Sequence, residues 1–511
     1  MNRKIISVLV SLCICTCFTS YALAQENSSL FSAVERGETS KVAQFIKEGI
    51  DVNTNNRKGE TALIIASKKG HIEVIKLLLA AGANANAADK DSETALMNAS
   101  LFGHTEVVKL LLTAGANVNA ADKDSKTALM NASLFGHTEV VKLLLTAGAN
   151  VNAADKDSIT ALLTASLFGH TEVVKLLLTA GANVNAANNK GTTALLIASH
   201  TKIVKLLIDA GANVNATMND GRTPLMEASR EGHAEIVKLL LAAKANVNAT
   251  TNDGWTALMA ASGNGHAEIV KLLLNAGAIV NAIDYDDSTA LMRASAKGHT
   301  EVIKLLLATE ANVNAYTNNG WTALMYASMY GHAEAVKLLL AAKANVNATT
   351  NDGLIALMAA SENGHAEIVK LLLNAGAIVN ATTNDGWTAL MDASCKGHVA
   401  VVKLLLAAGA NVNAINNNGA SILMTASGNG HTEVVKLLLN AGAIVNATTN
   451  DGWTALWIAS FKGHVAVVKL LLAAGANVNA TTNDGWTALW IARTSGHTEV
   501  VRLLQAAGAK E

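Results

Sequence analysis

Apolar residues recur along the chain at helical spacing, in short runs separated by polar turns. In the stretch "DKDSKTALMNASLFGHTEVVKLLLTAGANVNAA", Leu129 and Ala132 share one face of a short helix that Thr127 can cap and Gly136 can end. "TEVVKLLLTAG" predicts a second, amphipathic helix that ends at Gly148. The Asn- and Asp-rich stretch "ANVNAADKDSK" predicts an extended turn. Each unit is therefore expected to contain two helices and a long turn.

This unit fills nearly the whole chain. An Ala-Leu pair or a close equivalent begins at positions 62, 95, 128, 161, 194, 224, 257, 290, 323, 356, 389, 422, 455 and 488. Every step is 33 residues except the one from 194 to 224, which is 30. A fixed period of this length indicates a solenoid, in which each unit packs only against its neighbours. One elongated body is predicted, rather than several globular domains.

The unit "GRTPLMEASREGHAEIVKLLLAAKANVNA", residues 221–249, resembles the ankyrin repeat, whose pattern is G-x-T-P-L-H-x-A-A-x-x-G-H-x-E-V-V-K-L-L-L-x-x-G-A-D-V-N-A. The resemblance covers roughly residues 28–510, in fourteen tandem copies. It implies an all-α ankyrin-repeat solenoid of about 14–15 helix-turn-helix units joined by long β-turn loops, forming a curved, elongated rod. Only Pro224 keeps the proline of the family, and Met, Leu, Ile or Trp replaces its first histidine. We therefore expect apolar side chains where the family buries a hydrogen-bonding group.

The N-terminus has the pattern of a secretory signal peptide. Arg3 and Lys4 precede the apolar stretch 5–18, and Ala22-Leu23-Ala24 forms a small-residue cleavage site. We expect cleavage after Ala24 and export to the periplasm or the medium. A lipid anchor on a cysteine at 13, 15 or 17 is less favoured, because Leu, Ile and Thr precede these cysteines where a small residue is expected.

The repeats divide into segments by their variable residues. The domain prediction is a signal peptide at 1–24, an N-terminal capping repeat at 25–58, regular repeats with a Leu-Phe stripe at 59–191, a shortened repeat and candidate hinge at 192–218, regular repeats with Trp and Tyr at the turn tips at 219–480, and a C-terminal capping repeat at 481–511. The ends support capping, because the first unit is more polar than the others and Gln505 stands where other copies have Leu.

Charge and composition narrow the range of partners. After removal of the signal peptide the chain has 37 basic and 40 acidic residues, a net charge of −3, which argues against nucleic acid or an anionic membrane as the main partner. No other apolar run approaches membrane length, so no membrane insertion is expected after signal removal. Cys395 would be the one remaining cysteine, which excludes an internal disulfide. We expect a monomer.

The sequence offers no constellation for catalysis. The fourteen histidines occupy one repeat position, the His of Gly-His, and stacked repeats would separate them by about 10 Å. Metal ligands must converge on one ion within about 2.0–2.1 Å of it, so a histidine that helps to begin the second helix is the favoured interpretation. No nucleophile with a neighbouring base can be argued. We expect no enzyme, cofactor or metal site.

Candidate binding residues are the aromatic side chains that vary over the repeated framework. In the family that the chain resembles, the variable positions line the turn tips and the concave groove, which bind partner proteins, and Trp and Tyr are enriched in binding hot spots. The alternative is that the tryptophans stiffen neighbouring turns and that the Leu-Phe stripe is buried against an adjacent helix. The candidates are Trp255, Tyr285, Tyr316, Trp321, Tyr326, Tyr330, Trp387, Trp453, Trp486, Phe102, Phe135 and Phe168.

These features predict an exported, non-enzymatic scaffold that binds protein, most concretely along residues 285–390. Two alternatives stay open. A secreted effector that acts on host proteins would have the same fold and signal peptide. A structural spacer or stability factor in the cell envelope would explain near-identical copies without any binding hot spot. The identity of the partner does not follow from the residues.

Overall fold

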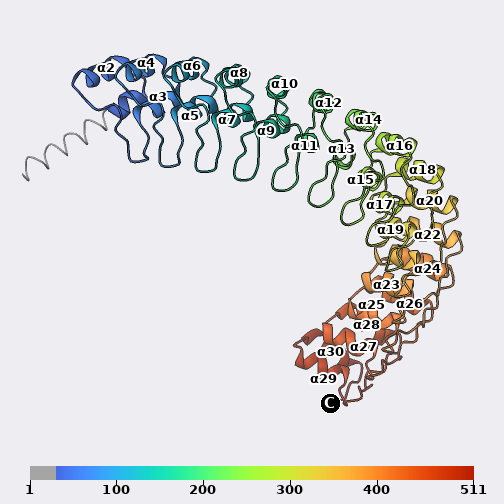
Figure 1. Cartoon of the computed structure of the whole chain (residues 1–511). Helices are drawn as coiled ribbons and strands as arrows, with labels where there is room; N and C mark the ends of the chain where they lie inside the picture. The colour runs from blue at the N-terminus through green and yellow to red at the C-terminus, as the bar shows by residue number, and fades with distance from the viewer. Residues whose placement is uncertain (1–29, 511) are drawn as a thin grey trace, which may run out of the picture. The chain divides into compact units, whose positions relative to one another are not determined.

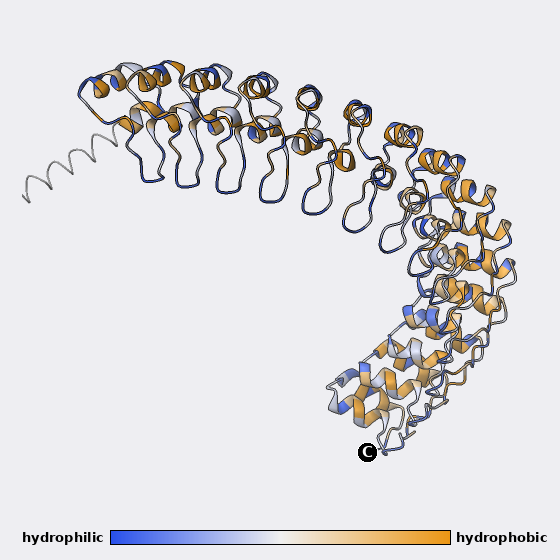
Figure 2. Cartoon of the chain, in the orientation of Figure 1, coloured by the Kyte–Doolittle hydropathy of each residue, from blue (hydrophilic) through white to orange (hydrophobic). Residues whose placement is uncertain are grey.

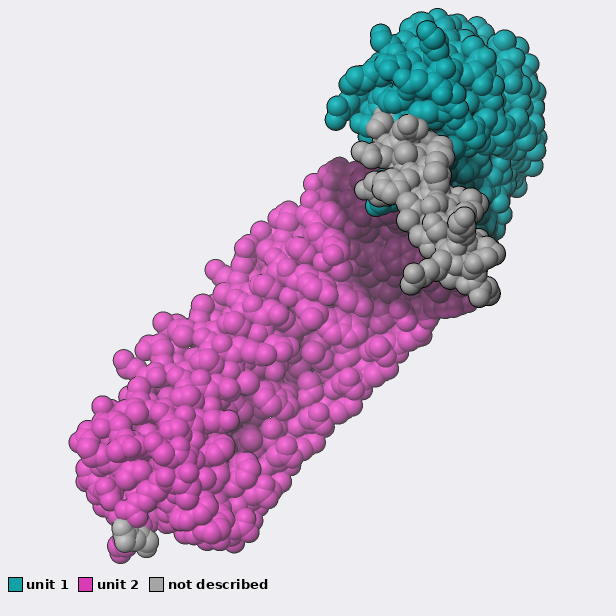
Figure 3. All heavy atoms as spheres, turned by 90° about the vertical axis from the view of Figure 1, so that its left-hand side faces the viewer, with its two compact units in different colours: residues 1–228, 233–246 teal, residues 229–232, 247–511 magenta. Residues whose placement is uncertain are grey.

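The computed structural model describes residues 30–510 and divides the chain into two compact units (Figure 3). The first comprises residues up to 228 together with 233–246, and the second comprises 229–232 together with 247 onward. The predicted signal peptide, 1–24, lies outside the described residues. Within those residues the regular structure is helical, and extended pairing is limited to isolated bridges such as Ala121 with Thr127.

Helices of the first unit alternate between the first and second helix of each repeat (Figure 1). Residues 30–35 form the first helix of the N-terminal repeat. The others are α2 (Thr39–Lys47), α3 (Ala62–Lys69), α4 (Ile72–Ala80), α5 (Ala95–Leu101), α6 (Thr105–Thr113), α7 (Ala128–Leu134), α8 (Thr138–Thr146), α9 (Ala161–Leu167), α10 (Thr171–Thr179), α11 (Ala194–Ile197), α12 (Thr201–Asp209) and α14 (Ala234–Ala242), while α13 (Pro224–Glu231) contributes to both units.

The second unit repeats the same alternation. Its helices are α15 (Ala257–Gly263), α16 (Ala267–Asn275), α17 (Ala290–Lys297), α18 (Thr300–Ala308), α19 (Ala323–Met329), α20 (Ala333–Ala341), α21 (Ala356–Glu362), α22 (Ala366–Asn374), α23 (Ala389–Lys396), α24 (Val399–Ala407), α25 (Ile422–Gly428), α26 (Thr432–Asn440), α27 (Ala455–Lys462), α28 (Val465–Ala473), α29 (Ala488–Thr494) and α30 (Thr498–Ala506). First helices pack on first helices, as α15 does on α17, and second helices on second helices, as α16 does on α18. The predicted succession of helix-turn-helix units is confirmed.

The core of each repeat is a thin layer of aliphatic side chains between the helices. In α8, Val140, Val141 and Leu144 are fully buried. Met97 and Met130, which stand where the ankyrin pattern has histidine, are also buried, as expected of apolar filler. Apolar residues follow the helices and polar residues follow the long turns, as the colouring of Figure 2 shows.

Threonine begins most first helices. Thr127 is extended, and its Oγ1 accepts a hydrogen bond from the backbone N–H of Met130 at 3.4 Å, which satisfies one free donor of the helix end. Thr223 caps α13 in the same way, with Pro224 at the first helical position. The repeat that begins near 350 is an exception, because Ile355 has no hydroxyl and is instead buried.

Histidine precedes each second helix from α4 onward, and in most repeats its ring links two repeats rather than capping the helix. His137 makes no side-chain cap bond, and its Nε2 lies 3.0 Å from the carbonyl oxygen of Leu101, 36 residues earlier. Twelve histidines repeat this contact at 2.8–3.2 Å. A carbonyl can only accept, so Nε2 carries the proton. His137 is the N-cap residue of α8, as the helix-starting interpretation expects, and its ring adds a bond that joins neighbouring repeats.

Asparagine links the second helices in a similar way. Asn119 donates its Nδ2 to the carbonyl of Gly148 at 3.2 Å, and its Oδ1 accepts from the N–H of Asn150 at 2.7 Å. The same pair of bonds recurs along the chain, for example from Asn347 to Gly376 and Ile378. Each turn is therefore fixed to the next repeat by side-chain amides.

The shortened repeat loses helix as well as turn. Its first helix, α11, has four residues instead of the usual seven or eight, Thr193 makes no side-chain cap bond, and Ala198 is extended. His200 lacks the link to the preceding repeat, and its Nδ1 lies 3.3 Å from the Oγ of Ser199. This repeat therefore has fewer backbone and side-chain hydrogen bonds than its neighbours.

Faster amide exchange is expected at 194–208 than at the equivalent residues 161–175. A helix of four residues without a cap opens at lower free energy cost than a capped helix of seven. Hydrogen exchange followed by mass spectrometry on peptides from both segments measures the difference. Equal protection would show that the deletion leaves the stacking intact and would remove the basis for a hinge at 192–218.

Candidate functional site

The turn tips of the second unit are held in a fixed geometry. Thr251 Oγ1 accepts from the backbone N–H of Trp255 at 3.0 Å, and Thr317 holds Trp321 in the same way at the same distance. At the tips, the side-chain amide of Asn351 donates to the carbonyl of Asn318 at 3.0 Å. The same bond joins the later pairs 384 to 351, 417 to 384, 450 to 417 and 483 to 450. The tryptophans therefore project from a connected row of turns.

Trp255 lies beside a cation from the next repeat. The guanidinium carbon of Arg293, on α17, is 3.7 Å from the centre of the Trp255 ring, which is close enough for a cation–π interaction. Trp255 is half-buried rather than fully exposed. Tyr326, from the following repeat, lines the same pocket, so three successive repeats contribute to it.

Asp284 fixes the position of Arg293. The two side chains form an ion pair, and the Asp284 carboxylate is almost fully buried. Its other oxygen, Oδ1, accepts from the N–H groups of Asp286 and Ser288, both at 3.0 Å. The turn and the helix therefore hold Arg293 against Trp255 before any partner binds.

The tyrosines divide between one packed and three exposed side chains. Tyr326 is half-buried, with its ring centre 5.2 Å from that of Trp321, and burial raises its pKa above the usual value. Tyr285, Tyr316 and Tyr330 are 73%, 67% and 53% exposed. Asn318 Nδ2 donates to the carbonyl of Tyr285 at 2.8 Å, which fixes the backbone at this tip. Exposed aromatic area on a fixed backbone is typical of binding hot spots.

The remaining predicted tryptophans differ in exposure. Trp387 is half-buried, whereas Trp453 and Trp486 are exposed. Trp453 stacks on Trp457 at 5.2 Å and Trp486 stacks on Trp490 at 3.8 Å, both between ring centres. Part of their surface is therefore occupied by the first helix of the same repeat, which is a different contact from the packing on neighbouring turns that the stiffening alternative supposes.

The sequence analysis did not identify three aromatic residues of the second unit, Trp457, Phe461 and Trp490, or the cation Arg293. Phe461 packs at 5.8 Å on Trp457, and Trp490 is itself exposed. Arg293 was overlooked because it stands inside the first helix, at a position that varies between copies while its neighbours stay constant. That variation is the signal that could have identified it.

The Leu-Phe stripe of the first unit is exposed. Phe102, Phe135 and Phe168 end α5, α7 and α9, and all three rings are accessible. Each stacks on the histidine two residues later, with ring centres 6.2–6.5 Å apart. None of them is buried against an adjacent helix, so the stripe is a second candidate surface.

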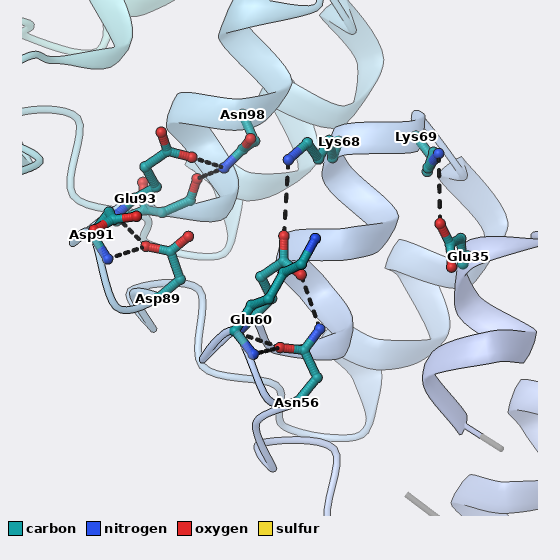
Figure 4. A network of polar contacts seen from close by, with 11 residues as sticks. Glu35, Asn56, Glu60, Lys68, Lys69, Asp89, Asp91, Glu93 and Asn98 are labelled. Carbon is teal, nitrogen blue, oxygen red and sulfur yellow. Dashed lines mark hydrogen bonds and ion pairs between the residues drawn. The ribbon is translucent and has the colours of Figure 1, made fainter. Parts of the chain in front are cut away.

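The first repeats present a polar face instead (Figure 4). Lys68 approaches Glu60 and Lys69 approaches Glu35, each at 3.8 Å. Asn98 donates to Glu93 at 3.3 Å. These charges are already paired within the chain, and exposed pairs of this kind contribute little energy. Exposed aromatic side chains begin at Phe102, so the Leu-Phe stripe and the Trp and Tyr residues of the second unit remain the two candidate surfaces.

Asp392, on α23, has an unusual ionisation. Its pKa is raised from 3.8 to about 7, chiefly by burial and also by the nearby negative charge of Glu362, while Lys396 acts in the opposite direction. Glu362 and Lys396 lie 3.5 Å apart. Perturbed carboxyls often mark functional sites, but burial and a neighbouring carboxylate are structural causes that account for this one.

Across residues 30–510, no three side chains of His, Cys, Asp or Glu are arranged so that they could hold a metal ion. Over the same range, no helix has the length and apolar character needed to cross a bilayer.

Comparison with known families agrees with the geometry. A model of three tandem ankyrin repeats matches residues 9–89, 30–122, 81–155, 129–218, 198–284, 281–350, 343–416 and 408–482, and a single-repeat model matches 484–510. No curated protein matches the chain. The matches cover most of the chain, and the helix pairs and turns agree with them, so the chain belongs to the ankyrin-repeat family.

Proposed function

We propose that the protein is an exported, non-enzymatic scaffold that binds a partner protein through the first-helix face and turn tips of residues 285–390. Ankyrin repeats indicate protein–protein interaction in general. The observation that carries the specific proposal is the group of exposed tyrosines, 285, 316 and 330, on turns and helix ends that neighbouring repeats hold in place. Rigid aromatic side chains bury large areas at a small cost in entropy.

Export is the second part of this proposal, and it rests on the pattern of residues 1–24. Two locations of the partner correspond to two functions. A partner from the cell's own envelope identifies an envelope scaffold, whereas a partner from a host identifies a secreted effector. A spacer without any partner is the third case.

Replacing Trp321, Tyr326 and Tyr330 with Ala is expected to abolish capture of the partner. Truncation of a hot-spot aromatic costs about 2 kcal/mol or more, so the combined loss exceeds about tenfold in affinity. The measurement is affinity capture with residues 25–511 as bait, from envelope extract and from candidate host extract, followed by mass spectrometry.

The matched control replaces Phe102, Phe135 and Phe168 with Ala, because these rings are also exposed but lie in the other unit. Circular dichroism confirms that both variants remain folded. If the Trp-Tyr variant kept the partner and the Phe variant lost it, the Leu-Phe stripe would be the binding surface. Capture of no partner by any of the three baits would favour the spacer, whereas equal retention of a partner by all three would place the contact outside both aromatic surfaces.

A further inference from the structure

One pocket lies where the proposed binding surface meets the preceding repeat, and it is small. Its volume is about 290 Å³, and Trp255, Asn264, Met292, Arg293, Lys297 and Tyr326 contribute to its lining. Pockets for complete small ligands usually measure about 300–1,000 Å³. This pocket therefore suits a single side chain of a larger partner.

The walls of the pocket are apolar and already in position. The indole of Trp255 forms one side and is held by Arg293, while the half-buried ring of Tyr326 forms another. Met292, at 2% exposure, closes the base. A preorganised apolar pocket favours an apolar side chain, because little ordering is needed when it binds.

The charged residues around the pocket indicate which residues of the partner can flank the apolar side chain that enters it. The three first helices that contribute to the pocket, α15, α17 and α19, contain Arg293 and Lys297 but no Asp or Glu. Arg293 is neutralised by Asp284, whereas Lys297, at the end of α17, is exposed and makes no ion pair within residues 30–510. Two acidic side chains of the same repeat come near: Glu301 is paired with Lys304, and the charge of Asp286 acts on Tyr326, so Lys297 is the charged group in the pocket lining that has no ion pair among residues 30–510.

We propose that this pocket takes one apolar side chain of an extended, acidic peptide segment, and that Lys297 pairs with a carboxylate beside that side chain. The proposal rests on the proposed function, since it defines which partner segment the aromatic surface recognises. It adds a requirement that the exposed aromatic residues alone do not impose: the partner segment must carry a negative charge beside Lys297.

The test uses fluorescein-labelled eleven-residue Gly-Ser peptides and fluorescence polarisation with the full chain. One peptide has a central Leu flanked by Glu, a second has the same Leu flanked by Lys, and a third has a central Ala flanked by Glu. The first is expected to bind at least tenfold more tightly than either of the others. Lys297→Glu, an exposed change, is expected to reverse the preference between the first and second peptides.

A second variant separates the pocket from the charge. Ala296, which also lines the pocket, is replaced by Leu to fill it, and this is expected to abolish the preference for Leu over Ala while leaving the preference for Glu over Lys. Equal binding of all peptides, binding of none at 1 mM, or an unchanged preference in Lys297→Glu would each overturn the proposal. Partner capture that depends on Trp321, Tyr326 and Tyr330 would then still stand, so the two failures are distinguishable.

Discussion

Gly136→Ala is expected to destabilise its repeat by about 3 kcal/mol. Gly136 ends the first helix of its repeat at φ +72°, where an L-residue costs about 1–2 kcal/mol. A Cβ built there would lie 2.5 Å from Nδ1 of His170, so the ring must move. That movement breaks the bond from His170 Nε2 to the carbonyl of Leu134, now 3.0 Å long, and a typical hydrogen bond contributes about 1 kcal/mol.

Gly148→Ala provides the matched control. Gly148 follows the second helix of the same repeat at φ +82°, but no atom lies within 4 Å of a Cβ added there. Lys244 and Lys343 occupy the equivalent position in other repeats at φ 64° and 65°, so side chains are tolerated. This control is expected to cost about 1–2 kcal/mol, the conformational part alone.

The measurement is local amide exchange, because a repeat array does not unfold in two states. Peptides covering α7, α8 and α9 report the change in opening free energy for each variant. A double variant, Gly136→Ala with His170→Ala, is expected to lose less than the sum of the single changes, since the ring is already gone. Equal costs at Gly136 and Gly148 would show that the histidine contact has no energetic role.

The helices and turns could be predicted because their signals are local. Thr127, Gly136 and Gly148 mark the ends of two helices within one repeat, and the structure places helix ends beside all three. The period of 33 then extends one unit to the whole chain. Signals that lie within a few neighbouring residues and recur in many copies can be recognised from a single sequence.

Contacts between repeats could not be predicted in the same way. His137 stands at the start of a helix in the sequence, yet its bond is to Leu101 in the preceding repeat. Likewise, Trp255 has no neighbour in its own repeat that explains its partial burial, because Arg293 comes from the next one. Predicting such pairs requires the offset between stacked units, which the sequence of one unit does not contain.

One position inside the first helix accounts for much of the chemical difference between repeats. Arg293, Tyr326 and Asp392 occupy it in three copies, whereas Ala260 and Ala359 occupy it in others. It faces Trp255 in one case, stacks under Trp321 in the second and is largely buried in the third. Variation at this position, together with the turn tips, is therefore the feature that distinguishes the repeats chemically.

Asp392→Asn is expected to stabilise its repeat at pH 8 and to have no effect at pH 4. The folded protein raises the pKa of Asp392 from 3.8 to about 7, first through burial and then through the charge of Glu362. The folded state therefore binds this proton more tightly than the unfolded state. Its contribution to stability is complete below about pH 4 and is lost as the pH rises through about 7.

The size of the effect follows from the shift. A pKa difference of one corresponds to 1.36 kcal/mol, so the rise from 3.8 to about 7 sets an upper bound of about 4 kcal/mol on the change in free energy of unfolding. Because water has partial access to Asp392, we expect about 2 kcal/mol. Asn cannot ionise, so the variant keeps at pH 8 the stability that the parent has only in acid.

Amide exchange in peptides from α23 and α25, compared between variant and parent at the same pH, measures the difference without interference from intrinsic exchange rates. Asp385→Asn is the control, since that carboxylate is exposed at a turn tip and its loss is expected to change stability equally little at both pH values. If Asp392→Asn gave the same stability difference at pH 4 and pH 8, the pKa of Asp392 would be the same in the folded and unfolded states, and the carboxylate would be ionised at neutral pH. The face of α23 would then carry a permanent negative charge, and an acidic partner segment would be repelled there rather than accepted.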